Sequence, residues 1–139
     1  MIEKVIFEQE TIAIMIRSSH KGDGIEFFTP VNFSQQLAYM NRAEGYTIEP
    51  HRHKQVARMI NFTQEVLLIK SGKVRVDFFD NYENFIKSSV LFEGDVILLA
   101  SGGHGLEFLE DSEIIEIKQG PYNKETDKTR FEAVALLSH

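Results

Sequence analysis

The chain has 139 residues, which is enough for one domain with a buried core. Hydrophobic residues make up 42% of it and 11 residues are Phe, so we expect a folded chain rather than a disordered one. It contains no Cys, which excludes disulfides and thiolate metal sites, so any metal must be bound by imidazole and carboxylate groups. The net charge of -6 and the lack of a basic stripe argue against a nucleic-acid partner.

The beginning of the chain, Met1-Ile2-Glu3-Lys4, does not have the pattern of a signal peptide. No apolar run approaches the length of a membrane span. We therefore expect a cytoplasmic protein that has no membrane partner.

Strand signals recur along the chain about every eight to twelve residues, with turn signals between them. The segment 73–79, KVRVDFF, shows the alternation of polar and apolar residues that a half-buried strand requires. The pattern predicts an all-β sandwich or barrel, and residues 126–137 are the one stretch with a helical alternative. The predicted strands, in chain order, are 11–17, 25–29, 35–41, 45–51, 65–69, 73–79, 84–91, 96–100, 104–110 and 112–119.

Two histidines and a carboxylate lie in or next to segments that are predicted to be strands. His51 and His53 are separated by one residue, so their imidazoles lie on the same side of an extended strand. If Glu65 begins a strand, Leu67 and Ile69 share its face. A carboxylate among apolar side chains costs several kcal/mol unless it has a partner, and a metal ion or a cationic side chain is such a partner.

A third histidine has the same kind of placement. If His104 begins a strand, Leu106 and Phe108 share its face, which puts the imidazole on the apolar, inward side. We therefore predict that four side chains converge on one divalent metal ion. These candidate ligands are His51, His53, Glu65 and His104.

The spacing of these residues resembles the first motif of the cupin family. The resemblance consists of Gly45, five residues, His51-x-His53, and then Glu65, six residues and Gly72. In the family the Glu usually follows the second His by a few residues, whereas here eleven residues intervene. We interpret residues 54–64 as an insertion before the strand that carries Glu65.

The second cupin motif is similar to Gly94, a short run and His104. The usual Pro-x-Gly-x-x-His is here the segment 100–104, ASGGH, which lacks the Pro and is one residue short. The whole resemblance covers residues 36–119. A narrower likeness is to the small WbuC-like cupin metalloproteins of bacterial polysaccharide gene clusters, and it is carried by the segment 116–122, EIKQGPY, with Asp127-Lys128 and Phe131.

The resemblance implies a double-stranded β-helix, the cupin or jelly-roll barrel, with a metal in its lumen. Residues 1–139 would be a single cupin domain, with N-terminal strands in 1–35, the barrel in 36–119 and a C-terminal tail in 120–139. The metal would be one divalent transition ion, and three His with one Glu do not choose among Fe, Mn, Ni, Co and Zn.

Three functions agree with the sequence. The first is a metal-binding cupin, expected to be an enzyme acting on a small polar or carbohydrate-type substrate such as a sugar or sugar nucleotide. The second is a metal-free nucleotide-sugar ketoisomerase or epimerase that uses His51 and His53 as acid and base. The third is a noncatalytic binding or sensing cupin. The sequence leaves open which of these it is, and it identifies no catalytic residue.

Two further expectations concern segments outside the motifs. Residues 1–30 are rich in β-branched residues and Phe, so we expect them to add strands across a homodimer interface. Residues 54–64 mix cations with Met, Ile and Phe, the composition of a flap over a ligand pocket, although a plain β-hairpin explains the segment equally well.

Overall fold

The computed structural model describes residues 1–121, 123, 125 and 127–132. Within them every regular element is a β-strand, and no helix is long and apolar enough to cross a membrane. They form two compact units, residues 21–62 and the described remainder. The strands are β1 (Ile2–Phe7), β2 (Glu10–Ile16), β3 (Gly24–Phe27), β4 (Ala38–Asn41), β5 (Glu65–Ser71), β6 (Lys73–Phe79), β7 (Phe85–Phe92), β8 (Val96–Leu99), β9 (Gly103–Phe108) and β10 (Glu113–Lys118).

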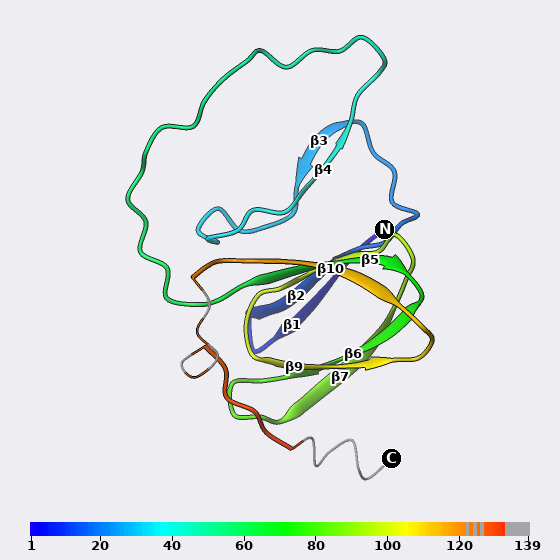
Figure 1. The fold of residues 1–139 in the computed structure, drawn as a ribbon, viewed down its shortest axis with the longest axis vertical. Helices are drawn as coiled ribbons and strands as arrows, with labels where there is room; N and C mark the ends of the chain where they lie inside the picture. Colours follow the sequence, from blue (N-terminus) through cyan, green and yellow to red (C-terminus); the bar gives the residue numbers. More distant parts are fainter. Residues whose placement is uncertain (122, 124, 126, 133–139) are drawn as a thin grey trace. The chain divides into compact units, whose positions relative to one another are not determined.

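The larger unit contains two antiparallel sheets (Figure 1). One has five strands in the order β1-β2-β8-β5-β10, and the other has three in the order β7-β6-β9. Alternate residues of each sheet face a single hydrophobic cluster, as the period of two requires. The cluster includes Met15, Leu67 and Ile97 from the first sheet and Val76 and Phe78 from the second.

Nine of the ten predicted strands are confirmed within a few residues, and the all-β prediction holds for the described part of the chain. The prediction of a strand at 45–51 is wrong, because no strand lies there. This segment contains Pro50, which has no backbone N–H to donate to a sheet. The prediction also missed β1, whose Val5 is buried and opposite Ala13 of β2. The sequence left a helix at 126–137 as an alternative. Only residues 127–132 of that segment are described, and they are not helical.

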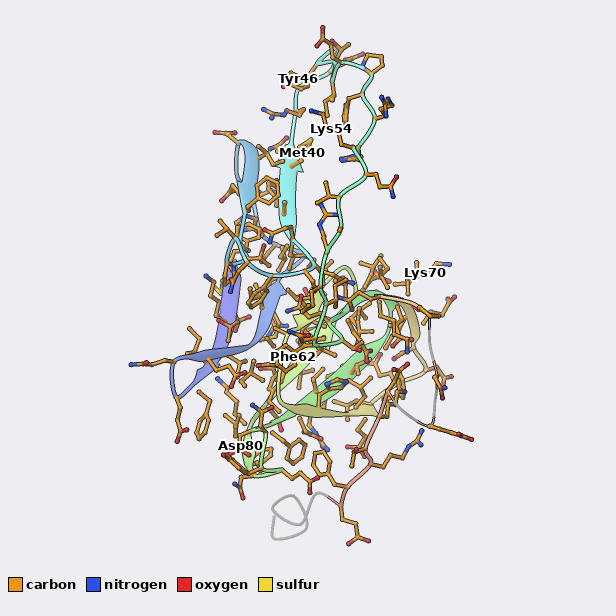
Figure 2. All side chains as sticks on the ribbon, turned by 90° about the vertical axis from the view of Figure 1, so that its left-hand side faces the viewer. Met40, Tyr46, Lys54, Phe62, Lys70 and Asp80 are labelled. Atoms are coloured by element: carbon orange, nitrogen blue, oxygen red, sulfur yellow. The ribbon has the colours of Figure 1, made fainter. Side chains whose placement is uncertain are left out.

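The smaller unit, residues 21–62, is built on the hairpin of β3 and β4, in which Gly24 is paired with Asn41. The Asn41 amide donates a 2.7 Å hydrogen bond to the carbonyl oxygen of Gly22. After β4 the chain contains no strand until β5. Figure 2 labels Tyr46 in this stretch, and the Arg42 guanidinium carbon lies 4.4 Å from the centre of its ring, a cation–π contact.

A buried carboxylate ties the start of the larger unit to the turn between β7 and β8. Asp95 is only 2% exposed. Its Oδ2 accepts hydrogen bonds from Arg17 Nη1 at 2.9 Å and from the Phe92 amide at 2.8 Å. Its Oδ1 accepts one from the Ser18 amide at 2.7 Å. The same Arg17 nitrogen donates to the Val90 carbonyl at 2.7 Å. The carboxylate therefore satisfies backbone groups in two separate segments as well as one cation.

Replacing Asp95 with Ala should lower the free energy of unfolding by about 3 kcal/mol, because it leaves two amides without their acceptor and removes the buried ion-pair partner of Arg17. Urea denaturation followed by circular dichroism measures this change. Glu93→Ala, in the exposed part of the same turn, is the matched control and should change stability by less than about 0.5 kcal/mol. Equal effects of the two substitutions would show that the Asp95 contacts do not stabilise the fold.

Candidate metal and ligand site

The larger unit contains a pocket of about 850 Å³. Its walls come from β5, β6, β9 and β10 and from the segment 127–131 that follows them in the chain. Most of the side chains that line it are polar or charged, whereas Phe79, Leu106 and Phe131 supply apolar surface. A concave site with polar groups beside aromatic surface has the general composition of a small-molecule site.

Two of the predicted ligands meet in this pocket. Glu65 is the first residue of β5, and Leu67 and Ile69, on the same face of that strand, belong to the core. His104 lies on β9 opposite Phe78, which is also a core residue. The His104 Nε2 atom lies 3.8 Å from Glu65 Oε1, and the side chains are 31% and 14% exposed. Both side chains therefore line one pocket from separate strands.

A second carboxylate, Glu116 on β10, lies beside Glu65 because β10 pairs with β5. Burial raises the pKa of Glu65 from its ordinary value of 4.5 to about 7, and the hydrogen bond to Glu116 and its charge act in the same direction. The Lys118 and Lys128 charges oppose this increase in the pKa of Glu65. The same hydrogen bond lowers the pKa of Glu116. At pH values below about 7 the pair therefore holds a proton on Glu65, which donates a hydrogen bond to the Glu116 carboxylate.

The imidazole of His104 favours its neutral form. Burial lowers its pKa below 6.5, and the positive charge of Lys128 lowers it further, while Glu116 has the opposite effect. A neutral imidazole is the form that coordinates metal ions. Glu65 and His104 therefore supply one oxygen donor and one nitrogen donor at the same wall of the pocket.

The other edge of the pocket carries a fixed cation. Arg75 Nε donates to Asp77 Oδ1 at 2.9 Å, and Arg75 Nη2 donates to Asp77 Oδ2 at 3.3 Å. Its Nη1 lies 2.7 Å from Glu107 Oε2, and the Ser88 hydroxyl donates to Asp77 Oδ1 at 2.6 Å. Because Arg75 and Asp77 alternate with the core residues of β6, they lie on the opposite face of that strand.

The other two predicted ligands, His51 and His53, belong to the smaller unit. Their ring centroids are 5.4 Å apart with the rings at 75°, and His51 Nδ1 lies 2.8 Å from the Glu49 carbonyl oxygen. The structure does not fix the position of residues 21–62 relative to the larger unit. The four-ligand site and the flap at 54–64 therefore stay predictions. Among the described residues, no three His, Asp or Glu side chains are gathered as metal ligands.

The sequence interpretation did not assign chemistry to Glu116, Lys118 or Lys128. All three line the pocket, and Glu116 and Lys118 lie on the same, inner face of β10. The available signal was the alternation within 112–119, which places residues 114, 116 and 118 on one face. Lys128 had no such signal, because it follows the last strand.

No protein-family model matches this chain, and no curated protein or solved structure matches it either.

Glu65 should make the metal-free protein less stable as the pH rises. Its pKa is higher in the folded state than the ordinary 4.5, so its stabilising contribution is complete below pH 4.5 and is lost as the pH rises through about 7. Glu65→Gln mimics the protonated side chain. Relative to wild type, the variant should gain on the order of 1–2 kcal/mol in unfolding free energy between pH 5 and pH 8.

Urea denaturation in the presence of EDTA measures this pH-dependent difference. Glu113→Gln is the control, because this carboxylate is exposed on β10 and its 3.6 Å ion pair with Lys70 is exposed as well. The control should show the same offset from wild type at both pH values. If Glu65→Gln also shows a constant offset, Glu65 does not hold a proton in the pocket.

Proposed function

We propose that this protein is a small metal-binding cupin whose pocket holds one divalent transition-metal ion and a small polar or carbohydrate-type ligand. The observation that carries this proposal is the convergence of Glu65 and His104, from different sheets, on one pocket at 3.8 Å. The double-stranded β-helix is part of the proposal, and two antiparallel sheets around one core support it.

The donor chemistry of the pocket suits such an ion. One carboxylate and one neutral imidazole are ligands for Fe, Mn, Ni, Co or Zn, and His51 and His53 would complete the set from the smaller unit. A divalent cation also offsets the charge of the adjacent Glu65 and Glu116 carboxyl groups. When bound, the ion supplies a Lewis acid that lowers the pKa of a coordinated water or binds an anionic oxygen.

The chain's own residues have separate tasks in this proposal. Glu116 accepts a hydrogen bond from the protonated Glu65 and so orients that side chain while the metal is absent. Arg75, fixed between Asp77 and Glu107, presents donors at the opposite edge of the pocket. Phe79 and Phe131 give the ligand an apolar wall.

This function is favoured over the metal-free ketoisomerase or epimerase, in which His51 and His53 act alone and the meeting of Glu65 with His104 has no task. A noncatalytic binding cupin uses the same pocket, and turnover of sugar nucleotides separates it from an enzyme. The homodimer also stays part of the proposal, and the mass in solution tests it.

Elemental analysis of protein purified without chelator or nickel resin should find close to one transition-metal ion per chain. The double variant Glu65→Ala, His104→Ala should lose nearly all of it, because both donors from the larger unit are removed. The double variant His51→Ala, His53→Ala should lose it as well if these residues complete the site.

His20→Ala is the matched control, because His20 also lies in the larger unit but its Nδ1 is 3.2 Å from the N-terminal nitrogen and it does not line the pocket. Circular dichroism confirms that each variant is folded. Full metal content in the Glu65 and His104 double variant would disprove the proposed centre, whatever the His51 and His53 double variant shows.

A further inference from the structure

A short segment after the last strand packs against the three-stranded sheet. Residues 127–131 run past the end of β6 and the start of β9 (Figure 1). The Phe131 ring meets the Phe79 ring edge to face, with centroids 5.0 Å apart and an angle of 86°. Phe79 makes a second such contact with Phe85 at 5.8 Å. The aromatic cluster anchors the segment at one point.

The place that Phe131 occupies exists because residue 103 is a glycine. Gly103 is opposite Phe79 in the register of β9 with β6. A Cβ atom at Gly103 would come within 2.8 Å of the Phe131 ring, too close for a real contact. Gly105 lies on the same face of β9, but there a Cβ would meet only Asp77 Oδ2, at an ordinary 3.9 Å. We call the space between Gly103 and Phe79 the Gly103 slot.

The contact between Phe131 and Phe79 restrains the residues that precede Phe131 in the chain. Lys128 stands three residues before Phe131 and lines the same pocket as Glu65 and His104. Two more cationic side chains, Lys118 and Arg130, line this pocket. A lysine brings a compact positive charge with three donors, which suits the oxygens of a carboxylate or a phosphate. A cation held in place before the ligand arrives costs less ordering entropy on binding than a mobile one.

We propose that residues 127–131 form a strap, pinned by Phe131 in the Gly103 slot, which holds Lys128 in the pocket to bind an anionic oxygen group, carboxylate or phosphate, of the ligand. The choice of ligand chemistry rests on the proposed function, since it takes the pocket to be the binding site. The anchoring of the strap does not depend on a metal.

The anchoring is tested first, with two glycine substitutions on one face of one strand. Gly103→Ala fills the slot, should displace the ring, and should expose the peptide bonds after Lys128 and Arg130. Limited trypsin digestion followed by mass spectrometry should find these bonds cut on the order of tenfold faster than in wild type, because cleavage follows the population of the open strap. Gly105→Ala should leave the rate unchanged.

A fluorescent reporter gives an independent measurement. The chain has no Trp, so Phe131→Trp introduces a single one. Its emission should lie at a short wavelength and shift toward the value of the unfolded chain when Gly103→Ala is added, but not when Gly105→Ala is added. If Gly103→Ala changes neither the digestion nor the emission, Phe131 does not pin the strap and the proposal is overturned.

The ligand chemistry is tested by calorimetric titration of the purified protein with inorganic phosphate and, separately, with malonate at constant ionic strength. Wild type should bind at least one of the two anions, and the one that binds distinguishes phosphate from carboxylate. Lys128→Gln should raise the Kd about tenfold, the usual loss for a charge-assisted contact. Gly103→Ala should raise the Kd similarly, and Gly105→Ala should keep it within about twofold.

The outcomes separate the two proposals. Binding of neither anion, or equal binding by wild type and Lys128→Gln, overturns the role of Lys128. Metal analysis of the same samples is independent of this result. Wild type that carries no metal but shows the expected digestion and titration would leave the strap in place and disprove only the metal centre.

Discussion

The apolar layer between the two sheets is the constraint on which the site depends. Each core side chain that leaves water contributes about 1.5–3 kcal/mol, so the strands must keep their alternate residues directed inward. Leu67 and Ile69 hold β5 in this way, and Val76 and Phe78 hold β6. Glu65 is the first residue of β5 and lies on the same face of that strand as Leu67 and Ile69. The packing that stabilises the fold therefore also places a carboxylate at the edge of the core.

The same constraint explains why several ionisable side chains gather in one pocket. Antiparallel pairing of β10 with β5 places Glu116 beside Glu65, and pairing of β9 with β6 places His104 opposite Phe78. Each group is partly removed from water by neighbours that are there for packing. Burial disfavours charge, so it raises the pKa of Glu65 and lowers the pKa of His104, whereas the hydrogen bond from Glu65 lowers the pKa of Glu116.

Much of the fold could be predicted from the sequence, because period-two alternation is a local signal. It placed β6 at 73–79, and it put Glu65 and His104 at the starts of strands, from which both line one pocket. It could not place β1, whose pairing with β2 decides its structure, since Glu3 and Lys4 interrupt the apolar pattern. The false strand at 45–51 gave no weight to Pro50, which has no backbone N–H to donate to a sheet.

The contribution of residues 127–131 could not be predicted from the sequence for a different reason. Phe131 packs on Phe79 because β9 has a glycine at position 103, and nothing local to any of the three residues indicates that contact. The strand boundaries of β9 and β6 had to be known before Gly103 and Phe79 could be placed opposite one another. Contacts of this kind depend on tertiary register rather than on propensity.

The strand order of the five-stranded sheet has a consequence for how the chain folds during synthesis. β2 pairs with β8, so Ala13 lies opposite Leu99, and Arg17 reaches Asp95 across 78 residues. The hairpin of β1 and β2 leaves the ribosome early, but the edge of β2 that pairs with β8 stays unpaired until β8 has been synthesised. Such non-local pairing makes folding slow relative to helical proteins of the same size. The nascent chain therefore exposes the apolar edge of β2 until most of the protein has been translated, and this interval is when it is most exposed to aggregation.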